Sequence, residues 1–346
     1  MTDGPLVPAG EVRRWIEAIE PPVAVTGGTG FVGSHLVDTL AEAGLRPRVL
    51  VRDPANPRWI AGRDVEWVPG GLGDGEALER LVEGARTVLH LAGVVRAGSA
   101  AAFDEANRIG TERLVHAVTE RATPGARFVL VSSLAAVGPS DRIEGVTPGD
   151  PPHPISAYGR SKLGGEEAVR RLGGDRPWVI LRPPAIYGPR DVDILQFFKL
   201  AAGGVVPLPA GERWITIAHV ADVVRAVLAA AGPDGPSRAV FHLGEPRPYR
   251  LQAMVRLLAE AGGVRARIVP VPGAVVRALG AGGSLLQRLG MRGVAMTSDK
   301  ARELLARHWT ARTADSLERL GVGEGIGFFE GAAATWTWYR AEGWVR

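Results

Sequence analysis

Tyr158 and Lys162 are the two residues whose types and spacing most directly suggest chemistry. They stand four positions apart, so on a helix their side chains share one face. The chain has four tyrosines and three lysines, and chance would give such a pair only about 4 × 3/346, or roughly 0.03, times. A phenol beside an ammonium can give and take a proton, because the positive charge favours the phenolate.

Hydride transfer between a dihydronicotinamide and a carbonyl is a reaction that uses such a pair. The alkoxide that forms needs a proton, and a tyrosine supplies it at neutral pH once its pKa falls by about three units, roughly 4 kcal/mol. Ser132 and Ser133 end an expected strand before Tyr158, where a hydroxyl can polarise the carbonyl. The alternative is that Tyr158 and Lys162 simply line a helix face.

A glycine-rich segment near the N-terminus has the features of a phosphate-binding loop. It reads Thr26-Gly27-Gly28-Thr29-Gly30-Phe31-Val32-Gly33, between an expected strand, Val23–Thr26, and an expected helix, Phe31–Ala43. The G-x-x-G-x-x-G spacing allows a tight turn, close approach of backbone N–H groups to a pyrophosphate, and close packing of helix on strand. A tight turn without a ligand is the alternative.

The residues after the second expected strand, Arg48–Val51, indicate which dinucleotide would bind. An acidic residue there holds a free ribose 2′-hydroxyl, whereas an arginine accommodates a 2′-phosphate. Arg52 directly follows the last apolar residue, and Arg58 stands six positions later, which predicts NADP(H). Asp53 leaves NAD(H) as the alternative.

Short apolar runs alternate with helical patterns up to residue 190, which predicts βαβ units and a parallel sheet. Further strands are expected at Val65–Val68, Thr87–Leu91, Phe128–Ser132 and Trp178–Leu181, and helices at Glu76–Glu83, Ala101–Arg121 and Tyr158–Leu172. Past residue 190 helices dominate, at Ile194–Ala202, Val220–Ala230, Leu251–Ala261, Ala274–Leu289, Asp299–Arg307 and Phe329–Tyr339, with strands at Val240–Leu243 and Arg267–Val271.

The expected fold is therefore α/β, a doubly wound parallel Rossmann sheet with a smaller, mostly helical C-terminal substrate lobe. Residues 1–21 form an N-terminal lead-in with one amphipathic segment, Glu11–Glu20. Residues 22–190 form the dinucleotide-binding domain and residues 191–346 the substrate lobe, with 214–243 returning to the Rossmann domain. A ligand would lie between the two, at the carboxyl ends of the strands.

Composition excludes several classes of protein. Cysteine is absent, so disulfides, thiolate metal sites and cysteine nucleophiles are excluded. The net charge is +4, but the arginines are scattered without a basic run of five, which argues against nucleic acid as a partner. We expect a cytoplasmic protein with no signal peptide and no integral membrane segment, because no run of 18 apolar residues occurs. We also expect no metal, because His90 has no second ligand at suitable spacing.

Together these motifs resemble the extended short-chain dehydrogenase/reductase family, also called the NAD-dependent epimerase/dehydratase family. The resemblance runs from about residue 22 to the end and is carried by Thr26–Gly33, His90–Gly93, Asn107 with Gly110-Thr111, Ser132-Ser133, Tyr158–Lys162, Arg182–Pro189, His219–Asp222 and Trp338–Trp344. It implies a nicotinamide-dependent oxidoreductase of this fold. It also implies a homodimer formed through the helices at Ala101–Arg121 and Tyr158–Leu172.

By this resemblance Ser133, Tyr158 and Lys162 are the catalytic triad, and Asn107 is a supporting fourth member. The cofactor-binding residues that it implies, besides Tyr158 and Lys162, are Gly27, Thr29, Gly30, Phe31, Val32, Gly33, Leu72, Leu91, Ala92, Gly93, Ser132, Pro183, Ala185 and Ile186. The chain departs from the family pattern at Gly71, where an aspartate that meets the adenine is usual. It departs again at Val137, where a tyrosine near the substrate is frequent.

Three functions are compatible with these motifs. The first is an NADP(H)-dependent oxidoreductase that interconverts a ketone or aldehyde and an alcohol on a lipophilic small molecule. This function is similar to that of the dihydroflavonol-reductase and 3β-hydroxysteroid-dehydrogenase branches. The segment Val49–Pro54 resembles the dihydroflavonol-reductase branch. The second is a nucleotide-sugar epimerase or dehydratase. The third is a non-catalytic dinucleotide-binding protein, against which an intact triad argues.

Two regions bear on the substrate. In the sugar-modifying branch an arginine five residues before the valine of the His-Val-x-Asp segment grips the nucleotide diphosphate. Ile215 stands at that place, and Arg213, two residues away, would substitute for it only after a local shift, so Trp214–Ile217 suggests an uncharged, lipophilic carbonyl. Further apolar residues of the C-terminal lobe either add to this surface or form the core of the lobe: Val275, Val276, Leu279, Leu285, Leu286 and Leu289.

Overall fold

The main sheet of the protein has seven parallel strands. The computed structural model describes residues 6–172, 176–289, 291, 294 and 296–345, so residues 1–5 of the expected lead-in lie outside the described part. The strands are β1 (Val23–Thr26), β2 (Arg48–Val51), β3 (Glu66–Pro69), β4 (Thr87–His90), β5 (Arg127–Val131), β6 (Trp178–Arg182) and β11 (Ala239–His242). Their order is β11-β6-β5-β4-β1-β2-β3, so the order reverses between β1 and β4. Ligands of such sheets bind at the carboxyl ends of the strands beside that reversal.

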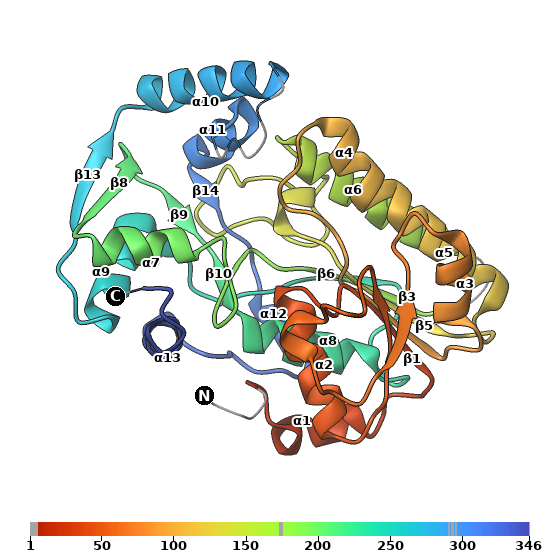
Figure 1. Ribbon diagram of the computed structural model, residues 1–346. Coiled ribbons are helices and arrows are strands. Elements are labelled where there is room, and N and C mark those ends of the chain that lie inside the picture. Colours follow the sequence, from red (N-terminus) through yellow and green to blue (C-terminus); the bar gives the residue numbers. More distant parts are fainter. Residues whose placement is uncertain (1–5, 173–175, 290, 292–293, 295, 346) are drawn as a thin grey trace.

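Helices cover both faces of this sheet, as the doubly wound prediction requires (Figure 1). One face carries α1 (Ala9–Ile16), α2 (Phe31–Glu42), α8 (Val220–Ala231) and α12 (Ala314–Leu320), and the other carries α3 (Gly75–Val82), α5 (Gly110–Arg121) and α6 (Ala157–Arg170). Neighbouring residues of β1 face opposite ways, since Val25 packs with α2 and α8 whereas Ala24 packs with α3 and α5. The prediction of the fold class is confirmed.

The smaller lobe, on the left of Figure 1, has its own aromatic core. Its helices are α7 (Leu195–Ala202), α9 (Leu251–Ala261) and α13 (Phe328–Ala341), with α10 (Gly273–Arg288) and α11 (Ser298–Leu305) forming a hairpin at the top of the figure. The Phe198 ring meets those of Trp336 and Tyr339 edge to face, with centroids 5.1 and 4.9 Å apart. Such pairs stabilise beyond the apolar area that they bury.

The lobe has several short strands, most of which are absent from the sequence prediction. They are β7 (Ala185–Tyr187) paired with β10 (Ile217–His219), β8 (Val205–Pro209) paired with β13 (Arg267–Val271), and β9 (Trp214–Ile215) between β12 (Tyr249–Arg250) and β14 (His308–Trp309). Of these, only β13 was expected. Strands this short carry too few residues for an alternation to show, and they form only because segments distant in sequence meet.

The prediction of one regular helix at Ala101–Arg121 is wrong. The structure has α4 (Ala100–Asp104), then a π-helical segment η2 (Glu105–Ile109), then α5. Two 3₁₀ turns, η1 (Arg58–Ile60) and η3 (Leu134–Ala136), lie elsewhere. A π turn inserts one extra residue into a helix and is frequent at functional sites, and this one contains Asn107.

The N-terminal segment packs on the Rossmann domain. Helix α1 lies earlier than the expected Glu11–Glu20 and buries Val12 and Ile16 in the cluster formed by α2 and α8. Within the segment 214–243, α8 packs on the main sheet and β11 is one of its strands, whereas β9 and β10 pair outside it. The exact domain limits stay a prediction. Over the described residues, every helix is too short or too polar to cross a bilayer.

Candidate active site

The glycine-rich loop between β1 and α2 fits a pyrophosphate. Gly27 has φ +75°, and a Cβ there would lie 2.6 Å from the Ala92 backbone nitrogen, so only glycine is accommodated. Gly33 packs so closely on Gly27 that a side chain would strike its carbonyl. Gly30 is the N-cap of α2 and supplies no side-chain acceptor to the first turn of that helix. The first backbone N–H groups of α2 therefore receive no side-chain acceptor from the N-cap. Such a helix N-terminus is a site at which anions bind.

The end of β2 separates the roles of Arg52 and Asp53. Asp53 Oδ1 accepts the Ala55 N–H at 3.1 Å, so this carboxylate is used by its own turn. Arg52 is exposed, its aliphatic carbons lie against Gly71, and within the described part of the chain no carboxylate pairs with it. A guanidinium without a protein anion is suited to a 2′-phosphate.

Tyr158 stands in the first turn of α6, beside Ser133. The helix starts there because Ser156 caps it, accepting the Gly159 N–H at 3.1 Å, and Asp299 accepts the Ala157 N–H at 2.7 Å. Burial raises the pKa of the Tyr158 phenol to about 12, and a hydrogen bond with the Ser133 hydroxyl acts in the lowering direction. The two groups expected to donate to a substrate carbonyl thus lie in contact.

Two carboxylates add to the raised pKa of Tyr158. Glu303 of α11 and Asp193 of the loop after β7 act on the phenol through their negative charge, while Phe103 of α4 packs on its ring with centroids 5.9 Å apart. The protein groups alone therefore disfavour the phenolate. The positive charge of an oxidised nicotinamide would favour it.

Lys162 lies one turn along α6 from Tyr158, as the spacing predicts. Its ammonium donates to the Val131 carbonyl at 2.8 Å, at the end of β5, and the position that a Cβ of Gly93 would take lies 3.6 Å from it. Burial lowers the pKa of Lys162 to about 8, so at pH 7 the cation is retained. Helix α6 is thereby joined to the carboxyl end of the sheet.

Asn107 connects the loop after β4 with helix α6. Its Oδ1 accepts the Val94 N–H at 2.9 Å, and its Nδ2 donates to the Val94 carbonyl at 3.0 Å and to Ser161 Oγ at 2.9 Å. Ser161 Oγ in turn donates to the Tyr158 carbonyl at 2.8 Å. With its side-chain amide bonded on both sides, Asn107 holds the loop against α6 and supports the position of Tyr158.

His90 is the centre of a buried chain of hydrogen bonds that the sequence does not reveal. Thr111 Oγ1 donates its only hydrogen to the Asn107 carbonyl at 2.6 Å, so it accepts from His90 Nε2 at 2.9 Å. His90 Nδ1 then accepts from Thr26 Oγ1 at 2.6 Å. This network assigns the tautomer, and burial lowers the pKa of His90 to about 3, so the ring is neutral. The chain links the end of β1 to the π segment.

A buried ion pair close to the site was also not predicted from the sequence. Glu166 of α6 accepts from Arg182 at 2.8 and 2.7 Å, from Arg170 at 3.0 Å, and from Ser132 Oγ at 2.6 Å. These bonds lower the pKa of the Glu166 carboxyl against the effect of burial. The Ser132 hydroxyl is thus directed at Glu166, and its expected role toward the cofactor stays a prediction. Only pairing across β6 and α6 brings these residues together.

The other predicted cofactor residues gather at the same edge of the sheet. Leu91, Ala92 and Gly93 follow β4, whereas Pro183, Ala185 and Ile186 follow β6. All are partly or fully exposed except Pro183, which is buried, and Leu72 packs its side chain on Gly110. The structure brings these residues, Thr29, Phe31 and Val32 of the loop, and Lys162 to the carboxyl ends of neighbouring strands, and their contacts with a dinucleotide stay predictions.

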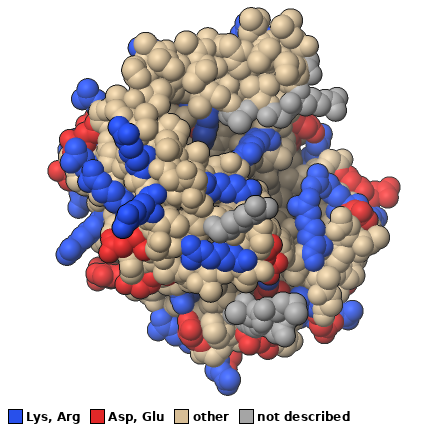
Figure 2. Space-filling view, turned by 60° about the vertical axis from the view of Figure 1, so that its left-hand side comes forward, with Lys and Arg blue, Asp and Glu red and all other residues tan. Residues whose placement is uncertain are grey.

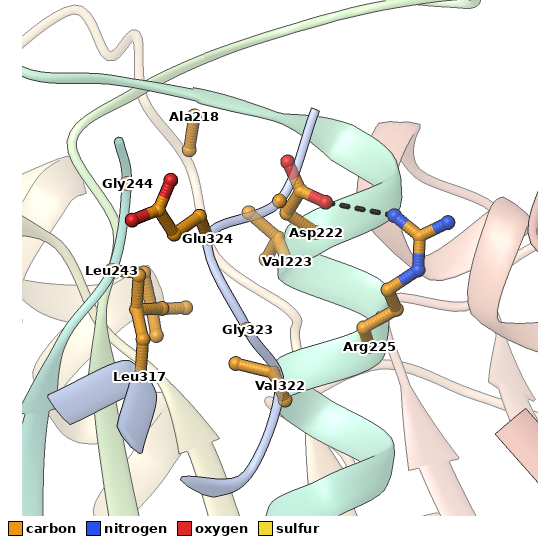
Figure 3. A pocket seen from close by; sticks show the side chains of 11 residues that line it. Ala218, Asp222, Val223, Arg225, Leu243, Gly244, Leu317, Val322, Gly323 and Glu324 are labelled. Atoms are coloured by element: carbon orange, nitrogen blue, oxygen red, sulfur yellow. Dashed lines mark hydrogen bonds and ion pairs between the residues drawn. The ribbon is translucent and has the colours of Figure 1, made fainter. Parts of the chain in front are cut away.

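The His219–Asp222 segment has a structural role. His219 Nδ1 accepts the Ala221 N–H at 3.3 Å as the cap of α8, and Asp222 accepts the Ile326 N–H at 2.9 Å and pairs with Arg225 at 2.8 Å. Figure 3 shows the small pocket beside Asp222 and Arg225, whose free volume of about 10 Å³ holds about one water molecule. None of its lining residues belongs to the predicted active site.

Comparisons with known proteins agree with this geometry. The model of the NAD dependent epimerase/dehydratase family matches residues 23–244. A ceramide reductase from Caulobacter vibrioides is 38% identical over 327 residues, covering 93% of this chain and 96% of the relative. The 4-hydroxy-2-methyl-3-oxo-4-farnesyl-3,4-dihydroquinoline-1-oxide ketoreductase of Stigmatella aurantiaca is 28% identical, covering 73% of this chain and 77% of that protein.

Solved structures share the fold over nearly the whole chain. MoeE5 in complex with UDP-glucuronic acid and NAD superposes with a TM-score of 0.74 at 26% identity, covering 93% of this chain and 100% of MoeE5. The predicted family and enzyme class are thereby confirmed, with a nicotinamide dinucleotide as the cofactor. The chain belongs to the NAD-dependent epimerase/dehydratase family, the extended short-chain dehydrogenases/reductases, and is an NAD(P)-dependent oxidoreductase.

Proposed function

We propose that the protein interconverts a ketone or aldehyde and an alcohol on a lipophilic small molecule, with NADP(H) as the preferred cofactor. The observation that carries the proposal is the contact between the Tyr158 phenol and the Ser133 hydroxyl, on a helix joined to the cofactor edge by Lys162. The ceramide reductase and the farnesyl-quinoline ketoreductase among the relatives support a lipophilic carbonyl compound as substrate.

The protein groups have distinct tasks in this reaction. When bound, a nicotinamide dinucleotide would supply the hydride in reduction and accept it in oxidation. Ser133 donates to the carbonyl oxygen while its own oxygen accepts the Ala135 N–H, which orients the hydroxyl. Tyr158 transfers its proton to the oxygen on which negative charge develops, and Lys162 stabilises the phenolate that remains. Asn107 positions α6 through Ser161.

The surroundings of Arg213 favour a lipophilic substrate over a nucleotide sugar. Its guanidinium donates to the carbonyls of Leu304 at 3.1 Å, Pro209 at 3.0 Å and Ala210 at 2.7 Å. This cation is thus used by the fold, and Ile215 offers no charge to a diphosphate. These bonds argue against Arg213 as a substitute for the phosphate-gripping arginine.

A paired substrate and binding screen tests the proposal. With NADPH supplied, a keto-ceramide, a steroid ketone and an aryl ketone are offered, and consumption of NADPH is recorded. We expect turnover of at least one of these lipophilic ketones. In parallel, binding of UDP- and dTDP-sugars is measured by calorimetry with NADP⁺ present. Micromolar binding of a nucleotide sugar that Arg213→Ala abolishes would overturn the reductase proposal.

We also infer a homodimer, through the helices of the segment 100–121 and α6, as the family resemblance implies. These helices lie side by side on one face of the sheet (Figure 1). Size-exclusion chromatography with light scattering is expected to give twice the chain mass of 36.6 kDa. A mass of a single chain at micromolar concentration would contradict this inference.

A further inference from the structure

Helix α10 exposes most of its large apolar side chains and buries mainly small residues. This is the reverse of the usual arrangement in helices of water-soluble proteins. The residues that face the protein are Val276, Gly280 and Gly283. A Cβ at Gly280 would lie 2.6 Å from the Ala301 side chain, so α10 and α11 approach through small residues. An ordinary surface helix buries its large apolar residues and exposes polar ones.

The large apolar side chains of α10 face outward. Leu279 and Leu285 are each 57% exposed, and Leu289, directly after the helix, is 73% exposed. Of the two alternatives for these residues, membership of the lobe core holds for Val276 and fails for the exposed ones. Of thirteen exposed large apolar residues in the described part of the chain, seven lie between Val269 and Met291: Val269, Val275, Leu279, Leu285, Leu286, Leu289 and Met291. An apolar concentration of this kind on a surface marks an interaction site.

The charge of this region has one sign. Between Glu260 and Asp299 the sequence has five arginines and neither aspartate nor glutamate. Arg277 and Arg288 of α10 are exposed, and neither pairs with a carboxylate among the residues that the structure describes. Figure 2 shows the upper part of the molecule, where Figure 1 places α10, as a mostly uncharged surface with Lys and Arg side chains at its edge and below it.

We propose that the outward face of α10 binds the surface of an anionic phospholipid bilayer. Outward leucines with unpaired arginines beside them are the composition of helices that lie in a membrane interface. Apolar side chains enter the acyl region there, and arginines pair with lipid phosphates. A second copy of the chain fits less well, because a symmetric contact would place arginines against arginines with no acidic partner in the segment.

The same helix is tied to the active site. Gln287 donates to the Ala97 carbonyl at 3.2 Å, in the loop that Asn107 holds through Val94. The adjoining helix α11 bonds the start of the catalytic helix through Asp299. Docking of α10 would therefore bring the predicted active site close to the bilayer, so that a membrane-resident substrate enters without crossing water. This second statement rests on the proposed function; the docking itself does not.

Vesicle co-sedimentation of the full chain tests the docking. Vesicles of phosphatidylcholine alone are compared with vesicles containing phosphatidylglycerol, at low and high salt. We expect binding to the anionic vesicles that high salt weakens, and a loss of about tenfold or more for Leu279→Ser with Leu286→Ser and for Arg277→Gln with Arg288→Gln. The matched control, Ile143→Ser with Phe329→Ser, changes two other exposed apolar residues, each 41% exposed, and is expected to bind as the native chain does.

A spectroscopic measurement separates the bilayer from other occupants. Because the chain has no cysteine, Leu279→Cys can carry a single polarity-sensitive dye, with Ile143→Cys as the control. A blue shift at position 279 that requires anionic vesicles supports the proposal. Native protein that stays in the supernatant with every vesicle overturns it, and so does a blue shift that follows protein concentration without lipid, which would indicate a second copy.

Turnover distinguishes failure of the docking from failure of the proposed function. The leucine variant is expected to reduce a short, water-soluble ketone at the native rate and a vesicle-embedded ketone at least about tenfold more slowly. If the native protein binds vesicles but reduces no ketone, the proposed function fails while the docking stands. Equal turnover of the vesicle-embedded ketone by both forms would overturn the delivery of substrate through α10.

Discussion

His90 Nε2 donates to Thr111 Oγ1 at 2.9 Å, and this bond connects the nucleotide-binding half of the sheet to the π segment that carries Asn107. Neither residue faces solvent, since His90 is 0% and Thr111 2% exposed. Both bond partners of the imidazole are threonine hydroxyls, and each hydroxyl has a second partner in the backbone. We therefore infer that Thr111 positions the predicted active site.

Replacing Thr111 by Val is expected to leave the His90 N–H without an acceptor. The unsatisfied donor costs about 1–3 kcal/mol of unfolding free energy, and displacement of Asn107 lowers kcat about tenfold to a hundredfold with little change in KM. Urea unfolding and steady-state kinetics measure both. Thr111→Ser keeps the hydroxyl and is expected to restore kcat, whereas a Val variant with native turnover would show that the network is only structural.

Replacing Tyr158 by Phe removes the proton donor while keeping the ring against Phe103. We expect kcat to fall by about 10² to 10⁴, the contribution usual for general acids, with the dinucleotide bound as tightly as before. Single-turnover kinetics and calorimetric titration of the dinucleotide separate the two. A Phe variant that turns over at the native rate would exclude Tyr158 from the reaction.

Replacing Arg52 by Ala tests the cofactor preference. A charge-assisted contact with the 2′-phosphate is worth about 1.5–3 kcal/mol, so the Kd of NADPH is expected to rise about 10- to 150-fold while that of NADH stays unchanged. Titration of both dinucleotides measures this, and Arg58→Ala shows whether the second arginine shares the task. Tighter binding of NADH than of NADPH by the native chain would contradict the preference.

The substitution Glu166→Gln is expected to lower the free energy of unfolding more than Glu167→Gln, which changes the exposed neighbouring residue. Removing the carboxylate leaves the guanidinium of Arg182, which is 1% exposed, without its counter-charge, and breaking a buried pair typically costs about 3–5 kcal/mol. Urea unfolding of both variants measures the difference. Equal midpoints for the two variants would show that the buried pair contributes little.

Stability is expected to fall as the pH drops below 6.5. Burial is the main cause that lowers the pKa of four histidines, to about 4 for His35 and His242 and to about 3 for His90 and His219. The unfolded chain then binds more protons, so the unfolding free energy is fully present above pH 6.5 and declines toward pH 4. Between pH 6.5 and 5 each histidine contributes roughly 1–2 kcal/mol of this loss.

Two carboxyls act in the opposite sense. Burial raises the pKa of Glu245 to about 7 and that of Asp191 to about 6, so their protonation in the folded state offsets part of the loss. Urea unfolding at pH 7 and pH 5 measures the balance, and we expect a lower midpoint at pH 5. Glu245→Gln should steepen this dependence. A midpoint that does not move between the two pH values would contradict the neutral state of the histidines.

The sequence alone determined the parts of this protein that depend on local spacing. Tyr158 and Lys162 share a helix face because they stand four residues apart, and the loop at Gly27–Gly33 turns because its glycines are where a strand meets a helix. Apolar strands alternating with helices can bury both faces of a sheet only when doubly wound. These features were predictable because each is set by residues within a few positions of one another.

Only the tertiary structure decided the parts that depend on distant segments. Glu166 and Arg182 form an ion pair because α6 packs on β6, and His90 meets Thr111 because the end of β4 lies beside the start of α5. The outward face of α10 was equally hidden. The sequence of α10 places apolar residues on one side and small residues on another. The glycine side is buried because only small residues allow α11 to approach so closely. A periodic pattern shows that a helix has faces, whereas the neighbour with which it packs determines which face meets water.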